Sequence, residues 1–316
     1  MNTAALGAGN DGAAVGARAT HSWGSGELCE SERSSQYSPL MSRLGQIAVN
    51  WSTPGCAVPI ASSPVKQSMI ALAAATAVAV VPAGSAAARP VKDKTLTENA
   101  LYKAGALPTT ACREKPIKKL DPKSARSYLN GVLACLNRTW AGELKAAGLK
   151  WSTPKVVYAT KAPARFCGAK WKDWGSYYCK ASRTIEIVLA KDLLEETDDL
   201  FLFFLMASLH GEHVQNLGGI ARAVNKLPYG SKAEFDEQNR RYYLQNICLA
   251  SAFVASVWKS LHRGREDWDD LLFYMRDWAG KSTGSRKSVT YWAGQGFATG
   301  DPAACNTWTA PSAKVA

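Results

Sequence analysis

One ten-residue stretch near the middle of the chain limits its fold more than any other feature. Nine of the ten residues from 200 to 209 are apolar, and Ser208 is the exception. A helix that is apolar on every side must lie inside a core, so other segments have to cover it. The stretch continues through polar residues to Gly218 and Gly219, which are expected to end the helix. We therefore expect a globular domain built around a buried central helix.

Flanking patterns predict the elements that pack around this helix. Apolar residues recur at helical spacing on both sides of it, and Ser231 with Glu234 forms a capping box at the start of one long helix. The expected flanking helices lie at residues 124–147, 231–258, 266–279 and 286–298. Alternating β-branched runs predict strands at residues 155–160 and 183–190. The fold class is therefore α+β, rich in helices, with a small β element.

The cysteines indicate an oxidising compartment. Of 8 cysteines, six lie beyond residue 88, and a closed set of disulfides needs an even number. None has the Cys-x-x-Cys spacing typical of thiolate zinc sites. Six cysteines allow many connectivities. We predict the one that joins near neighbours and ties the irregular tail to the second long helix: Cys112–Cys135, Cys167–Cys179 and Cys248–Cys305. Cys167 and Cys179 bracket a loop of aromatic residues that includes Trp171, Trp174, Tyr177 and Tyr178.

The front of the chain differs in composition from the rest. Residues 1–66 are rich in Gly, Ala and Ser and are interpreted as a low-complexity, disordered leader. Residues 67–88 combine an apolar run with a small-residue boundary, which is typical of a signal peptide. Its position far from the first Met leaves a membrane anchor as the alternative. The folded domain is expected at residues 89–316, secreted to the extracellular side, or tethered there if residues 67–88 are retained.

Charge is concentrated in one part of the chain. With 38 basic and 26 acidic residues the formal net charge is +12, and residues 89–183 alone hold 20 basic and 6 acidic residues. Such a stretch is consistent with a solvated basic face or with a site for an anionic envelope polymer. No motif for specific nucleic-acid recognition is present, and no apolar run is long enough for a multi-span membrane protein.

Two of the four histidines lie on the expected central helix. His210 and His213 are three residues apart with Glu212 between them. At about 100° per residue the two rings are about 60° apart around the helix, close enough to contact one metal ion, whereas Glu212 lies nearly opposite His210. Ionisable groups in a buried helix are costly unless they are paired or used. These three side chains are weak candidates for a metal site, and a satisfied polar helix end is the simpler interpretation.

The same segment resembles a known motif. Residues 208–216 read Ser-Leu-His-Gly-Glu-His-Val-Gln-Asn, where the zinc helix of the bacterial neutral zinc metallopeptidase family typically reads His-Glu-Tyr-Gly-His-His-Val-Gln-Asn. Residues 241–251 are similar to the second helix of that family, and residues 177–185 and 296–308 resemble its strand and its closing segment. The resemblance covers residues 99–309 and implies a zincin-like, disulfide-stabilised metallopeptidase scaffold.

The family's chemistry is missing from this chain at the aligned positions. A catalytic zinc needs three protein ligands, an open position for water and a base. The resemblance implies that two histidines and an acidic residue of the second helix supply the ligands, and that a glutamate is the base. The substituted positions are Ser208, Leu209, Glu212, Tyr243 and Ile247. Leu209 can neither polarise water nor relay a proton. Glu212 can remain ionised in this helix if it reaches solvent or the neighbouring Arg240 or Arg241.

Three hypotheses follow from these observations. The first is an exported pseudopeptidase with no cofactor, in which the cleft still binds a peptide or protein partner. The second is an active zinc peptidase with an unorthodox site at His210, His213 and Glu212. The third is a basic protein that binds anionic polymers of the cell envelope through residues 89–183.

Overall fold

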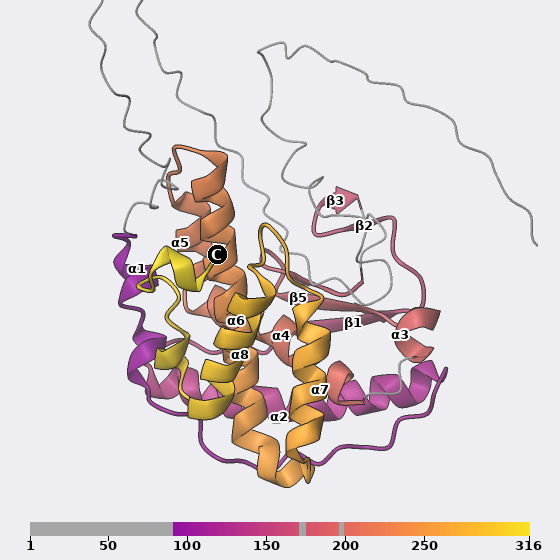
Figure 1. Ribbon diagram of the computed structural model, residues 1–316. Helices are drawn as coiled ribbons and strands as arrows, with labels where there is room; N and C mark the ends of the chain where they lie inside the picture. The colour runs from indigo at the N-terminus through magenta and orange to yellow at the C-terminus, as the bar shows by residue number, and fades with distance from the viewer. Residues whose placement is uncertain (1–90, 171–174, 196–198) are drawn as a thin grey trace, which may run out of the picture.

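The computed structural model describes residues 91–170, 175–195 and 199–316 (Figure 1). The predicted leader at residues 1–66, the apolar segment at residues 67–88, and Trp171 and Trp174 lie outside the described residues. The α-helices are α1 (Lys94–Thr97), α2 (Pro122–Ala146), α3 (Lys191–Glu195), α4 (Asp199–Leu217), α5 (Ile220–Lys226), α6 (Lys232–Leu261), α7 (Arg265–Arg276) and α8 (Arg286–Thr299). Short 3-10 helices are η2 (Ala100–Lys103), η3 (Pro302–Cys305) and η4 (Ser312–Lys314). The strands are β1 (Lys155–Ala159), β2 (Arg165–Phe166), β3 (Ala169–Lys170), β4 (Tyr177–Cys179) and β5 (Thr184–Val188).

The central helix is α4. Its apolar half, residues 200–209, is buried along its whole length, because α2, α6, α7 and β4 pack around it. Figure 1 shows α2 crossing behind α4, while α6, α7 and α8 stand side by side in front. Gly219, with φ of 78°, lies between α4 and α5, in the left-handed backbone conformation that glycine adopts readily. The architecture is the helix-rich α+β class expected from the sequence.

The tightest helix pair is α6 with α8. Gly296 of α8 lies against the backbone of Cys248 on α6, and an ideal Cβ at Gly296 would be 2.0 Å from the Cys248 carbonyl oxygen. Only glycine permits this approach, since a carbonyl in the middle of a helix cannot move aside. Gly294, two residues earlier, has open space around its Cα.

A three-stranded sheet covers one end of the core in the order β1-β5-β4. Strands β1 and β5 are parallel, with Val156 opposite Ile185, and β4 is antiparallel to β5, with Tyr178 opposite Ile185. Tyr177 and Tyr178, expected in the aromatic loop between Cys167 and Cys179, therefore belong to a strand. The pairing of β4 with β5 is a tertiary contact that local composition does not indicate.

Three disulfides join the cysteine pairs predicted from the sequence. Cys112–Cys135 ties an irregular segment to α2, Cys167–Cys179 ties the loop after β2 to β4, and Cys248–Cys305 ties α6 to η3. Disulfides persist in oxidising compartments, so these bonds indicate an extracellular or periplasmic location. Among the described residues, no helix is both long enough and apolar enough to cross a membrane.

Glu143 of α2 is a buried carboxyl group that makes stability depend on pH. It is 4% exposed, and its Oε1 atom has no hydrogen-bond partner among the described residues. Burial, together with the charge of Asp301, raises the pKa of Glu143 from 4.5 to about 7. Between these two values the folded state binds more protons than the unfolded state, so stability should fall as pH rises through this window.

Glu143→Gln is expected to remove that part of the pH dependence. Urea unfolding measured from pH 4.5 to 7 should give a flatter profile for the variant than for the wild type. Glu98→Gln, at a side chain that is 59% exposed, serves as the control. Equal slopes for Glu143→Gln and the wild type would contradict the assignment.

Candidate functional site

Polar side chains in the second half of α4 are as buried as the apolar ones in its first half. Ser208, His210, Glu212, His213 and Gln215 all have an exposed fraction of 0%. Burying polar groups is costly unless partners are supplied, so the neighbouring elements determine what each side chain can do. The side chains divide between a side that faces α6 and β4 and a side that faces α2 and the segment before β1.

At the position of the family's first zinc histidine, Ser208 is tied to α6. Asn246 Nδ2 donates a hydrogen bond of 2.9 Å to Ser208 Oγ. The Asn246 amide also lies against Gly211, where an ideal Cβ would be 2.2 Å from Asn246 Oδ1. The amide therefore fills the space between the two helices beside Ser208.

The other substituted positions belong to the hydrophobic core. Leu209 and Ile247 are fully buried, and Tyr243 is 3% exposed. All three pack within the main apolar cluster of the domain. Each of these side chains contributes packing where the family sequence places carboxylates.

Glu212 lies in a closed polar environment, without the contact with solvent or with Arg240 or Arg241 that would keep it ionised. It does not reach solvent, and neither of its carboxyl oxygens has a hydrogen-bond partner among the described residues. Burial raises the pKa of Glu212, and the nearby Lys180 ammonium opposes that rise. Lys180 follows β4, its own pKa is lowered by burial, and its Nζ lies 5.7 Å from the centre of the Tyr242 ring.

Arg240 and Arg241 make other contacts, which explains why neither pairs with Glu212. Arg241 forms an ion pair of 2.7 Å with Glu237 on its own helix and donates to carbonyl groups of the C-terminal tail. Arg240 donates to the carbonyls of Val315 and Lys281. Both guanidinium groups thus hold the tail against α6.

His213 takes part in a directional chain of hydrogen bonds. Its Nε2 is 2.6 Å from the Ser152 carbonyl oxygen, which can only accept, so Nε2 carries the proton. Its Nδ1 then accepts from the Tyr178 hydroxyl at 2.8 Å, and Asn216 Nδ2 donates to that hydroxyl at 2.9 Å. Burial lowers the pKa of His213 to about 4, which keeps the ring neutral near pH 7.

His210 lies next to His213, with 5.7 Å between the ring centres. Its Nε2 is 3.0 Å from Asn137 Oδ1, and its Nδ1 has no hydrogen-bond partner among the described residues. The Trp151 ring stacks on His210 and meets His213 edge-on. Burial lowers the pKa of His210 well below its ordinary value.

The structure brings the two histidines together and keeps Glu212 on the side of α4 that faces Lys180. In the described part of the chain, no group of three or more His, Cys, Asp or Glu side chains is arranged to hold a metal ion. Lys180, Asn246 and Trp151 were not singled out from the sequence. Lys180 and Asn246 do lie in segments that resemble the family, at residues 177–185 and 241–251.

Comparison with known proteins identifies the family. A family model described as "Putative neutral zinc metallopeptidase" matches residues 88–271, more than half of the chain. The chain belongs to this family. This metallopeptidase-family chain is also 28% identical over 221 residues to "Uncharacterized protein YpfJ" of Escherichia coli K12, an alignment that covers 62% of this chain and 76% of the relative. The protein of that name from Escherichia coli O6:H1 matches equally well. No solved structure matches the chain, and the zincin-like scaffold stays a prediction from the resemblance.

Proposed function

We propose that this metallopeptidase-family domain is an exported pseudopeptidase that has lost zinc binding and peptide hydrolysis. The observation that carries the proposal is the hydrogen bond from Asn246 to Ser208, together with the packing of the same amide against Gly211. A family zinc ligand would have to enter the space that this amide fills.

The donor atoms at the aligned positions do not fit a catalytic zinc. Zinc in proteins is bound by thiolate, imidazole and carboxylate groups, with three protein ligands in a catalytic site. Of the five substituted positions, only Glu212 carries such a group, and Ser208 offers a hydroxyl that already accepts a hydrogen bond. Leu209 replaces the base, so no side chain at that position can take a proton from water.

The alternative site at His210 and His213 lacks support from their contacts. Both ring nitrogens of His213 are engaged, by Ser152 and by Tyr178, so a metal would have to displace one of these bonds. His210 has one free ring nitrogen among the described contacts, but a single imidazole is a weak site. Glu212, the third candidate, lies with Lys180 instead.

Zinc content tests the proposal directly. The full chain, purified without chelators, is expected to hold well below one zinc per chain by elemental analysis, and to show no chelator-sensitive hydrolysis of a denatured protein substrate. An active member of the family prepared in the same way is the positive control. About one zinc per chain with chelator-sensitive hydrolysis would overturn the proposal and promote His210 and His213 to ligands.

Binding is the role left for a domain without hydrolysis. We place this role outside the cytoplasm, as a secreted protein, because the three disulfides need an oxidising compartment. The partner under this proposal is a peptide or protein. N-terminal sequencing of secreted protein should find a start near residue 89, whereas retention of residues 67–88 would indicate a tethered form.

A further inference from the structure

The basic charge of the domain has a local maximum at residues 113–126, called the basic segment below. It leads into α2 and includes the first turn of that helix. All of its cations are exposed: Arg113, Lys115, Lys118, Lys119, Lys123 and Arg126. Within the described part of the chain, no ion pair joins any of the six to an acid.

The two acidic residues within the basic segment contact groups of the domain other than the six exposed cationic side chains. Glu114 accepts from the Tyr128 hydroxyl at 2.6 Å and forms an ion pair of 3.0 Å with Arg263. Asp121 caps α2 by accepting from the backbone N–H of Lys123 at 2.9 Å. Glu195, at the end of the adjoining helix α3, pairs with Lys191 on its own helix. The positive charge of the segment is therefore largely uncompensated by these acids.

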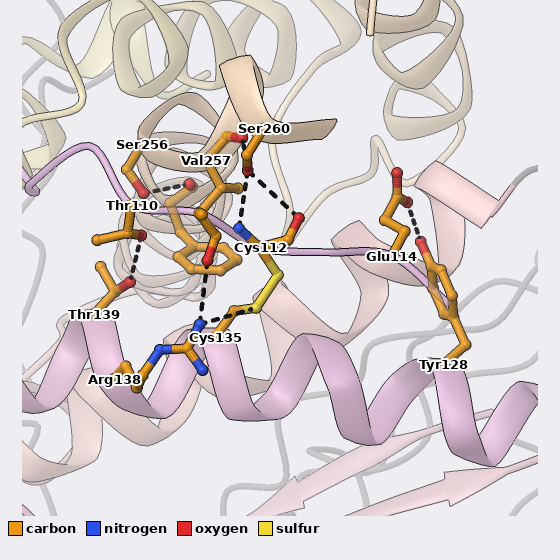
Figure 2. Close-up of a disulfide and its surroundings, with 12 residues drawn as sticks. Thr110, Cys112, Glu114, Tyr128, Cys135, Arg138, Thr139, Ser256, Val257 and Ser260 are labelled. Atoms are coloured by element: carbon orange, nitrogen blue, oxygen red, sulfur yellow. Dashed lines mark hydrogen bonds between the residues drawn. A yellow bond between two sulfur atoms is a disulfide. The ribbon is translucent and has the colours of Figure 1, made fainter. Parts of the chain in front are cut away.

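The segment is held to the domain at several points. The Cys112–Cys135 disulfide fixes its start to α2, and the Cys112 backbone N–H donates to Ser260 Oγ at 2.9 Å (Figure 2). Figure 2 also shows Glu114 and Tyr128 meeting farther along. Near its far end, the Leu120 backbone N–H donates to the Leu194 carbonyl at 2.8 Å. The cations are thus presented on a fixed backbone.

Leu120 adds an apolar group to this charged surface. Its side chain is 49% exposed between Lys119 and the start of α2. Its φ of 57° lies in the left-handed region, which is strained for a leucine. Strained residues that persist are typical of functional surfaces. An exposed apolar side chain among lysines is the combination that favours the interface of an anionic bilayer, because the apolar group enters the headgroup layer and the ammonium groups meet the phosphates.

We propose that the basic segment docks the domain on a bilayer that contains anionic phospholipid. The charge complements the lipid phosphates, and Leu120 distinguishes this partner from a soluble polyanion, which would use the cations alone. This proposal does not depend on whether the domain binds zinc. The vesicle experiment can therefore contradict it without contradicting the proposed function, and the zinc measurement can do the reverse.

Co-sedimentation with vesicles tests the proposal. The full chain is mixed with vesicles of phosphatidylcholine alone, or of phosphatidylcholine with about 30 mol% phosphatidylglycerol. The readout is the partition coefficient for the anionic vesicles divided by that for the neutral vesicles. Any binding of residues 67–88 that does not depend on lipid charge cancels in this ratio. We expect a ratio of about ten or more at low salt, and a ratio near one at about 0.5 M salt.

Charge-reversal variants locate the surface. Lys118→Glu, Lys119→Glu and Lys123→Glu together should lower the ratio at least about tenfold. Arg222→Glu, Lys281→Glu and Lys287→Glu are the matched control, since these exposed cations lie away from the segment and give the same change in net charge. The control triple should keep most of the binding. Equal losses in both triples would show a response to net charge alone and overturn the assignment.

Leu120→Asn separates lipid from polymer. Asparagine accepts the left-handed conformation, so thermal stability should be kept or raised, while anionic vesicle binding falls about threefold or more. Polyphosphate, a soluble polyanion, is measured in parallel. The proposal would be overturned if the triple variant of Lys118, Lys119 and Lys123 lost polyphosphate binding while the protein showed no preference for anionic vesicles and Leu120→Asn had no effect. The partner would then be a soluble polymer and not a bilayer.

Discussion

Gly296→Ala is expected to destabilise the domain by about 3 kcal/mol or more, because the added methyl group would overlap the backbone of a neighbouring helix. The new Cβ would lie 2.0 Å from the carbonyl oxygen of Cys248 and 2.9 Å from its carbon. Both are backbone atoms of α6, so relief requires moving α8 away from α6. That movement would open the most extensive helix contact of the fold and strain the nearby Cys248–Cys305 bond.

Gly294→Ala is the matched control in the same helix. An added Cβ at Gly294 meets nothing within 4 Å, so the change should stabilise α8 by up to about 1 kcal/mol through helix propensity. Urea unfolding under non-reducing conditions measures both variants. If Gly296→Ala proved as stable as Gly294→Ala, the close approach of α8 to α6 would be wrong.

Rebuilding the family site is expected to produce a gain of zinc affinity of at least about a hundredfold over the wild type. The family ligands and base return with Ser208→His, Leu209→Glu and Glu212→His, together with either Ile247→Asp or Tyr243→Glu. Asn246→Ala must accompany them, because its amide fills the space beside Ser208 and Gly211. Competition with a chromophoric chelator measures the affinity. Ser208→His with Glu212→His alone should gain little, since two ligands leave the site incomplete.

A further substitution, Lys180→Met, extends the same experiment. The Lys180 ammonium lies near the position of Glu212, and a buried cation repels a metal ion. Adding Lys180→Met to the rebuilt variant should therefore tighten zinc binding further. Unchanged affinity would mean that the ammonium is too far away to act on that site.

The long helices could be predicted from the sequence because their signals are local. The expected helix at residues 124–147 corresponds to α2 (Pro122–Ala146), and Ser231 does cap α6, accepting from the Glu234 backbone N–H at 3.2 Å. Local pattern did not predict strand β4, although residues 177–185 resemble a strand segment of the family, because its three residues become a strand only through pairing with β5. Helix α5 carries too few residues for a periodic pattern.

In the candidate site, too, relations within one helix could be predicted from the sequence, and contacts between distant segments could not. Helical spacing predicts that His210 and His213 lie near each other and that Glu212 points elsewhere, because all three belong to one helix. It cannot predict that Lys180, directly after β4, and Asn246 of α6 meet this helix, since those contacts depend on packing between distant segments. Nor can it predict that Arg240 and Arg241 face the tail and not Glu212.

The order of the cysteines along the chain has a consequence for how the domain matures. In the described part of the chain each cysteine bonds to the next one, so the loops at residues 112–135, 167–179 and 248–305 follow one another without overlap. Thiols that are oxidised in the order in which they leave a translocation channel meet their native partners first. Each disulfide can therefore form before the cysteines of the next loop emerge. The Cys248–Cys305 bond between α6 and the tail then needs no prior rearrangement of non-native disulfides.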